Sequence, residues 1–194
     1  MPASGPLALA PEIDRFRAQF EQLSSEADAL VAPLSDLAFT WQPAPDSWSV
    51  VQCIDHLNAT AREYLPMLDQ GIADAIRRGL YSPGPYAYNW IGRLMAWTVD
   101  PNTRIRAKAP RAFLPPVSRP RHDVMAAFRA YQVQYIDRLR QANGLDLARA
   151  RVASPVVRWI RMPLGSGFAM MIAHERRHLQ QARRVIQKFN EQPR

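Results

Sequence analysis

Apolar residues recur three and four positions apart in four segments of the chain, which is the spacing of one face of an α-helix. These segments span residues 11–32, about 49–78, about 121–142 and about 165–189. No stretch alternates apolar and polar residues in the way that is typical of a half-buried strand. Four amphipathic helices without strands predict an all-α fold, in which residues 11–190 form a single-domain four-helix bundle.

Residues that favour helix starts or helix ends mark the limits of the first two helices. Pro11 suits the first turn of the first helix, and Pro33 ends that helix. Ser49 and Gln52 have the spacing of a capping box, so the second helix is expected to begin at Ser49. Pro66 falls within the second helix, where it predicts a kink or an early end.

Residues 79–120 separate the second and third helices, and this segment is rich in proline and glycine. Within it, residues 91–99 ("IGRLMAWTV") have a pattern that suits a short helix. Long connections often carry function, so we expect this Pro-rich insertion to cover the mouth of a pocket. Residues 1–10 lack the basic start and the apolar stretch of a signal peptide, and we expect them to form a flexible tail.

The composition is that of a folded protein. Hydrophobic residues make up 47% of the 194 positions, which argues against disorder and suffices for one domain with a buried core. No apolar run reaches the roughly 18 to 20 residues that a membrane span needs, so no membrane partner is expected. Cys53 is the only cysteine, which excludes an internal disulfide and fits a reducing cytoplasm. It lies on the apolar face of the second helix and is expected to be a core residue, not a nucleophile.

The formal net charge of +8 raises the question of whether the chain binds nucleic acid. The basic residues are nearly all arginines, since Lys108 and Lys188 are the only lysines, and they are scattered without a run longer than a pair. No stretch interleaves aromatic and basic residues in the pattern that stacks bases. The scatter favours a solvated, arginine-rich surface and leaves nucleic-acid binding as the weaker alternative.

Three histidines occupy positions that suit a metal site. His174 and His178 lie four residues apart in the last helix, at one edge of its apolar face, so both imidazoles can reach one ion. His56 lies at the corresponding edge of the second helix. If these two helices are neighbours, the three imidazoles converge, and three histidines with a further open position are typical of a catalytic or substrate-binding metal site. Glu175 falls near the centre of the apolar face, where its carboxylate would face the interior.

Other interpretations of these residues stay open. A histidine at the edge of an apolar face is often a half-exposed packing residue. The segment "HERRH" also fits the zinc protease pattern H-E-x-x-H, with Glu175 as general base, but no histidine follows His178 as a third ligand. Glu175 is our candidate proton acceptor or a partner that orients an imidazole, or else a buried carboxylate paired with an arginine. His122 opens the third helix without such neighbours and is expected at the surface.

Two segments of the chain resemble DinB-like (DinB/YfiT) proteins. The first, "LSDLAFTWQPAPDSWSVVQCIDHLNATAREY", has a Trp-Ser pair that opens the second helix and a His-Leu pair two turns later. The second, "IAHERRHLQQARRVI", has an H-x-x-x-H pair that is followed by a glutamine. The resemblance implies a DinB-like four-helix bundle that binds a divalent metal ion, zinc or nickel, through His56, His174 and His178.

Some members of that family are thiol-dependent transferases or isomerases, others resemble hydrolases, and members often form dimers. The resemblance therefore implies a metal-dependent transferase or hydrolase that acts on a small-molecule substrate, such as a low-molecular-weight thiol, as a homodimer. The alternative from another class is a non-catalytic helical bundle that binds a ligand or a partner. The Pro-rich insertion departs from the family pattern, and for this reason the identity of the substrate does not carry over.

Overall fold

The computed structural model describes residues 8–86, 113–114, 119–157 and 159–192. Within these ranges the chain is predominantly helical, as the periodicity predicts, with five helices and one two-stranded sheet. The elements are α1 (Pro11–Val31), α2 (Asp36–Thr40), α3 (Val50–Arg77), α5 (Arg121–Gln141), β1 (Arg151–Ala153), β2 (Arg161–Pro163) and α6 (Leu164–Asn190).

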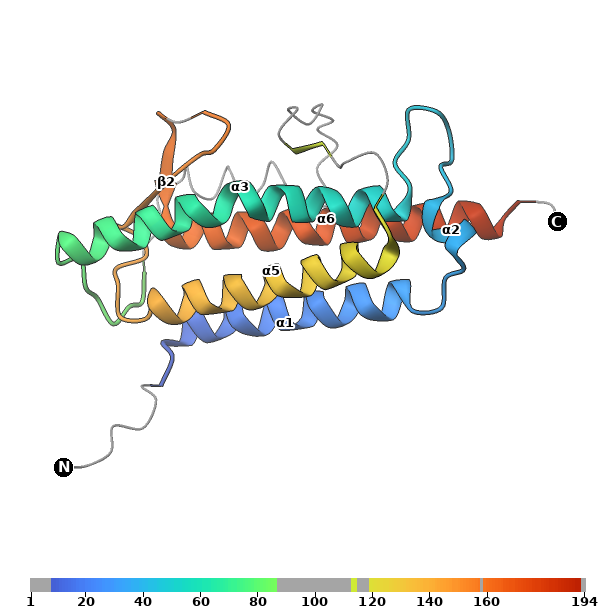
Figure 1. The fold of residues 1–194 in the computed structure, drawn as a ribbon. Helices are drawn as coiled ribbons and strands as arrows, with labels where there is room; N and C mark the ends of the chain where they lie inside the picture. The colour runs from blue at the N-terminus through green and yellow to red at the C-terminus, as the bar shows by residue number, and fades with distance from the viewer. Residues whose placement is uncertain (1–7, 87–112, 115–118, 158, 193–194) are drawn as a thin grey trace.

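The four long helices lie side by side and share one core (Figure 1). α3 packs against α5 and α6, and α1 packs against the same two helices. Aromatic pairs join α1 to both neighbours. The rings of Phe20 and Tyr135 stack with centroids 4.8 Å apart, and those of Phe16 and Phe168 lie 6.2 Å apart. This packing places α3 beside α6, which is the condition under which the three histidines can converge.

The start of α3 follows the sequence prediction, whereas one of the two alternatives predicted at Pro66 fails. Ser49 caps α3 with a full capping box, because its side chain accepts the N–H of Gln52 and the Gln52 side chain accepts the N–H of Ser49. The predicted early end at Pro66 is wrong, since α3 continues to Arg77. Pro66 is exposed, so its ring costs the helix a backbone hydrogen bond without disturbing the core.

A short helix and a hairpin extend the predicted set of elements. Ser35 begins α2, because its side chain accepts the N–H of Ala38, but five residues are too few to show a helical repeat. The expectation of no strands is wrong, because β1 and β2 pair antiparallel with Val152 opposite Met162. Each strand has only three residues, so no alternation is visible in the sequence.

The β1–β2 hairpin packs closely against the helices. Val152 and Met162 are fully buried in the common core. At Gly71 of α3, an added Cβ would lie 2.7 Å from the main-chain oxygen of Arg151, so only glycine allows this approach. In the connection between the strands, the N–H of Ile160 donates to the carbonyl of Val157 at 2.9 Å, and Trp159 is 86% exposed.

Parts of two other predictions fall outside the described residues. The short helix expected over residues 91–99 lies there, as does most of the Pro-rich insertion. Residues 8–10 of the expected tail are described and are tied to the body of the protein. The N–H of Ala10 donates to Oδ1 of Asn143 at 2.9 Å, and Nδ2 of Asn143 donates to the carbonyl of Ala8 at 3.2 Å.

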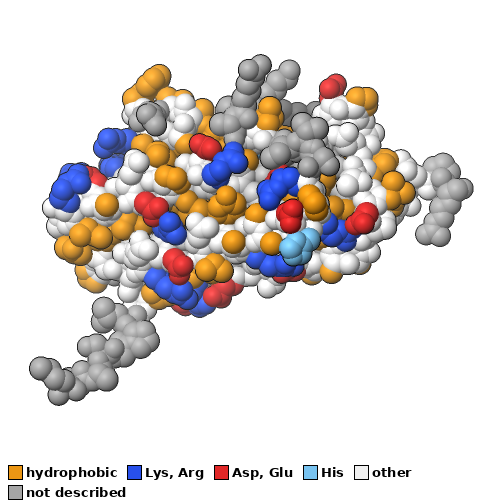
Figure 2. Space-filling model, viewed as in Figure 1, with side chains coloured by type: hydrophobic (Ala, Val, Ile, Leu, Met, Phe, Trp, Pro, Cys, Tyr) orange, Lys and Arg blue, Asp and Glu red, His pale blue; other side chains and the backbone are white. Residues whose placement is uncertain are grey.

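The surface mixes charges of both signs. Figure 2 shows Lys and Arg side chains interspersed with Asp and Glu over one face, without a separate basic patch. Several pairs are in direct contact, such as Arg138 with Asp69 at 2.8 Å and Arg183 with Glu26 at 2.6 Å. This face therefore resembles the solvated, arginine-rich surface that the sequence favours. None of the described helices combines the length and the apolar character that crossing a membrane requires.

Candidate metal centre

Three histidine side chains from two helices meet in the structure. His56 lies in the second turn of α3, and His174 and His178 lie on consecutive turns of α6. α3 and α6 run side by side (Figure 1), and one ligand atom of each imidazole lies within 4.8 Å of those of the other two. The three residues selected from the sequence therefore form a group that can hold a metal ion.

His56 is held by a main-chain group. Its side chain is buried, and its Nδ1 lies 2.6 Å from the carbonyl oxygen of Phe113. Because a carbonyl oxygen only accepts, Nδ1 carries a proton and donates it. In the neutral ring this leaves a lone pair on Nε2, the atom that faces His174. The Phe113 carbonyl thus selects the tautomer in which Nε2 of His56 can bind a metal ion.

His178 is oriented by a contact within α6. Its Nδ1 lies 3.1 Å from Oε1 of Gln181, one turn further along the helix. The amide oxygen accepts the Nδ1–H, so the lone pair of the neutral ring is on Nε2. Trp48, which precedes the N-cap of α3, packs against the rings of His56 and His178 with centroid distances of 4.8 and 5.6 Å. The indole therefore restricts both imidazoles and covers one side of the cluster.

His174 completes the cluster and is its least buried member. Its Nε2 lies 3.1 Å from Nε2 of His56 and 3.4 Å from Oγ1 of Thr60. Two nitrogen ligands of one tetrahedral zinc ion are about 3.3 Å apart, given Zn–N bonds of about 2.0–2.1 Å. The separation of the His56 and His174 nitrogens is therefore close to the one that a shared ion requires.

Burial keeps the imidazoles neutral. It lowers the pKa of His174 to about 3 and the pKa of His178 to about 2, and the neighbouring histidines act in the same direction. Burial also lowers the pKa of His56, although the bond to the Phe113 carbonyl opposes this shift. Since the neutral imidazole is the form that binds metal ions, the cluster offers three neutral nitrogen donors at physiological pH. This donor set fits a divalent transition-metal ion, because imidazoles bind zinc, nickel, copper and iron alike.

Glu175, the candidate proton acceptor, points into the core as its position in the helix predicts. Its side chain is 4% exposed, and its Oε2 accepts a hydrogen bond of 3.0 Å from Nε2 of Gln132 on α5. Burial raises the pKa of Glu175 to about 8, and the bond from Gln132 opposes this shift. Within the described part of the chain, its carboxylate has neither an arginine partner nor a hydrogen bond to an imidazole.

Two other residues with reactive side chains lie apart from the cluster. The side chain of His122 is 89% exposed and lies 3.1 Å from Asp123, so its expected surface position is confirmed. Cys53 is fully buried, and burial raises the pKa of its thiol to about 12. The expectation that Cys53 is a core residue is confirmed, and its thiol is poorly suited to act as a nucleophile.

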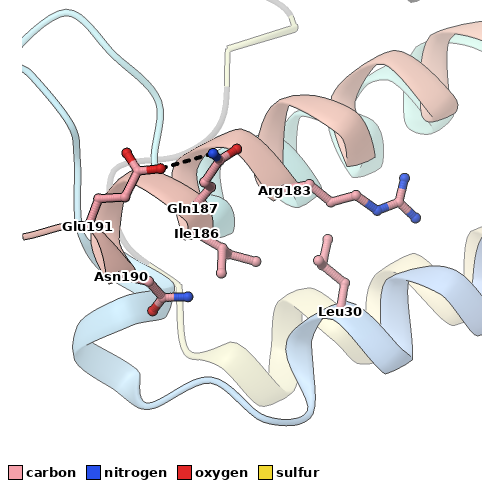
Figure 3. Close-up of a pocket in the computed structure, with 6 residues that line it drawn as sticks. All are labelled: Leu30, Arg183, Ile186, Gln187, Asn190 and Glu191. Carbon is pink, nitrogen blue, oxygen red and sulfur yellow. Dashed lines mark hydrogen bonds between the residues drawn. The ribbon is translucent and has the colours of Figure 1, made fainter.

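A groove of about 400 Å³ lies between the end of α1 and the end of α6 (Figure 3). Leu30 and Ile186 are its apolar lining residues, and Nε2 of Gln187 donates to Oε1 of Glu191 at 2.9 Å beside it. The three histidines are absent from its lining, so the groove is separate from the candidate metal centre.

The sequence does not indicate every residue that supports the cluster. Trp48 enters the sequence argument only as part of the Trp-Ser pair that opens the second helix, and its contacts with two histidines are not predicted. The Gln181 contact follows from the spacing of one helical turn after His178, so helix geometry could have found it. No sequence pattern indicates the contact between the Phe113 carbonyl and His56, because the carbonyl is a main-chain group 57 positions away.

Comparison with known proteins gives one family match. A family model described as the DinB superfamily matches residues 19–182. This range includes most of α1 and α6, and it contains the three histidines together with Glu175 and Gln181. No curated protein and no solved structure gives a significant match to the chain.

Proposed function

The chain belongs to the DinB superfamily, and we propose that it is a divalent-metal-dependent enzyme. In this proposal His56, His174 and His178 bind one zinc or nickel ion and leave further coordination positions open to a small-molecule ligand. The reaction is a transfer or isomerisation that uses a low-molecular-weight thiol, or a hydrolysis.

The convergence of three neutral imidazoles is the observation that supports this proposal most directly. Nδ1 of His56 and Nδ1 of His178 are both engaged by oxygen acceptors, which leaves the opposite ring nitrogens as lone-pair donors. Such hydrogen bonds commonly orient histidines that bind metal ions. A histidine with only a packing role does not need a fixed tautomer.

In the proposed enzyme, the metal ion and the residues of the chain have different chemical roles. A divalent ion lowers the pKa of a bound water or thiol and so supplies a nucleophile near neutral pH. The chain keeps the three imidazoles neutral, fixes the tautomers of His56 and His178, and packs Trp48 against these two rings. Glu175 is our candidate proton acceptor or a partner that orients an imidazole, because it follows His174 directly in α6. With a pKa of about 8, a minority of the carboxyl is ionised at pH 7, and this ionised fraction is the form that can accept a proton.

The finer architecture is also part of the proposal. We infer a DinB-like four-helix bundle that forms a single domain over residues 11–190, with a tail at residues 1–10 and the Pro-rich insertion between α3 and α5. The contacts of α1 and α3 with α5 and α6 support the bundle. The free, buried Cys53 is compatible with a cytoplasmic protein. We also propose a homodimer, because members of the family often form dimers.

Elemental analysis of untagged protein tests this function. After incubation with zinc or nickel and removal of the excess, the wild type is expected to retain about one ion per chain. The triple variant His56→Ala, His174→Ala, His178→Ala is expected to lose the ion. His122→Ala is a matched control, because His122 is the exposed histidine, and it is expected to retain the ion.

The metal content of these proteins decides between the two classes of function. Metal that is lost in the triple variant and kept in His122→Ala would justify a screen with thiol and ester substrates. A wild type that takes up neither metal would contradict the proposal and favour the non-catalytic bundle.

A further inference from the structure

Asp55, the residue before His56 on α3, is a buried carboxylate with two side-chain partners. Its side chain is 3% exposed, and its Oδ1 accepts hydrogen bonds from Arg119 at 3.0 Å and from Asn58 at 3.1 Å. A buried carboxylate requires such partners, because an unpaired charge in the core is strongly destabilising. Asp55 therefore holds the Arg119 guanidinium firmly against α3.

Arg119 and Phe113 belong to the same stretch of chain before α5, and they contact neighbouring residues of α3. The Phe113 carbonyl accepts from His56, and the Arg119 guanidinium donates to Asp55. Two successive positions of α3 thus bind two points of one short stretch of chain. Phe113 and Arg119 are six positions apart, so the position of Arg119 on α3 keeps Phe113 within at most about 20 Å of it.

Asn58 reinforces this arrangement one turn further along α3. Besides its bond to Asp55, its Nδ2 donates to the carbonyl of Val124 at 3.0 Å. Val124 lies in the first turn of α5, which begins two residues after Arg119. The polar cluster of buried Asp55 and Asn58 with partly exposed Arg119 therefore anchors Arg119 and the start of α5 to the turn of α3 that carries His56.

We propose that Arg119 is a positioning residue for the metal site, an inference that rests on the function proposed above. Its ion pair with Asp55 fixes Arg119 on α3 beside His56, and Arg119 lies six positions along the chain from Phe113, whose carbonyl accepts from Nδ1 of His56. Without the ion pair the carbonyl moves away, and His56 loses the hydrogen bond that sets its tautomer and ring orientation. A metal ligand that is no longer held in place binds its ion more weakly.

The chain offers a matched control for this ion pair. Arg138 on α5 binds both carboxylate oxygens of Asp69 on α3, at 2.8 and 3.0 Å. This pair also links α3 to the chain of α5, but Asp69 lies about 20 Å along α3 from His56. Arg119→Ala and Arg138→Ala therefore each remove an arginine–aspartate pair on α3. The first pair adjoins the histidine cluster and involves a buried aspartate, whereas the second lies far from the cluster and involves a half-exposed one.

The first test is the zinc affinity of the folded variants, measured by competition with a chelator. Arg119→Ala is expected to bind zinc about 10-fold or more weakly than the wild type, because loss of a group that orients a ligand commonly costs about 10- to 100-fold. Arg138→Ala is expected to stay within about 2-fold of the wild type. Arg119→Lys keeps the charge and is expected to recover part of the affinity. Equal affinities of the wild type and Arg119→Ala would overturn the proposal.

The second test needs no metal. A bonded Nδ1–H of His56 gives a slowly exchanging imidazole resonance in proton–nitrogen NMR spectra of the metal-free protein, assigned by its absence in His56→Ala. This resonance is expected to shift or vanish in Arg119→Ala and to persist in Arg138→Ala. An unchanged resonance in Arg119→Ala overturns the proposal whatever the zinc affinity.

The role of Arg119 can still be tested if a variant fails to fold or if the wild type binds no metal. If Arg119→Ala fails to fold, Asp55→Asn replaces it, because the amide keeps the shape of the side chain and removes the charge that binds Arg119. If the wild type binds neither zinc nor nickel, the proposed function fails, while the NMR comparison of the metal-free proteins still decides the role of Arg119.

Discussion

The Gln132 side chain on α5 donates a 3.0 Å hydrogen bond to the carboxylate of Glu175 on α6. Both side chains are buried, with exposed fractions of 3% and 4%. Burial raises the pKa of Glu175 to about 8 from its ordinary value of 4.5, so the folded protein keeps a proton that the unfolded chain releases. Glu175 therefore links the stability of the protein to pH.

Glu175→Gln is expected to become more stable relative to the wild type as pH rises from 5 to 8. Between pH 4.5 and 8 the unfolded chain loses the Glu175 proton and the folded protein retains it, so the wild type loses up to about 1.4 kcal/mol per pH unit. The glutamine has no proton to lose and still offers an oxygen to Gln132. Urea unfolding of the metal-free proteins at several pH values measures the difference.

A second variant tests whether the pH dependence of the stability difference is specific to the buried Glu175. Glu191→Gln changes an exposed glutamate at the end of α6 and is expected to track the wild type at each pH. A constant stability difference between the wild type and Glu175→Gln over this range would mean that the folded protein holds Glu175 ionised.

Gln181→Ala is expected to weaken zinc binding about 10-fold without removing a ligand. The amide oxygen of Gln181 lies 3.1 Å from Nδ1 of His178, and its loss frees the imidazole to rotate and to change tautomer. Gln180→Ala, which alters the preceding residue, is the matched control, since Gln180 bonds Arg184 at 3.3 Å and not a histidine. Equal zinc affinities for the two variants would exclude an orienting role for Gln181.

Zinc affinity is expected to change little between pH 7.5 and pH 6. Protons compete with zinc only near the pKa of each ligand, and burial lowers the pKa of His174 to about 3 and that of His178 to about 2. Three histidines with the ordinary pKa of about 6.5 would instead lose roughly 50-fold in affinity over the same interval. Titration with a pH-insensitive competing chelator separates these two cases.

The thiol of Cys53 is expected to resist alkylation in the folded protein and to react fully in denaturant. The side chain is fully buried, and its pKa of about 12 leaves almost no thiolate at neutral pH. Mass spectrometry after iodoacetamide treatment measures the modified fraction. In a Cys53→Ala background, Ala126→Cys places a thiol on the exposed face of α5 as a reactive control. Rapid modification of native Cys53 would contradict the buried position.

The local features of this protein could be predicted because they depend on residues close together in the chain. Helical periodicity located the four long helices, and the capping box of Ser49 located the start of α3. The positions of His56, His174 and His178 on the edges of two apolar faces selected the candidate ligands. Elements of three to five residues, such as α2 and the β1–β2 hairpin, lack enough positions to show a period and could not be predicted.

Spacing along each helix is enough to specify which residues face the core and which histidines can share an ion. The packing of the helices was needed to place α3 beside α6, to bring the Phe113 carbonyl to His56, and to bring Gln132 to Glu175. The pKa shifts of the histidines and of Glu175 likewise arise from burial. These features join residues tens of positions apart, and a local pattern in the sequence carries no information about which distant residues will meet.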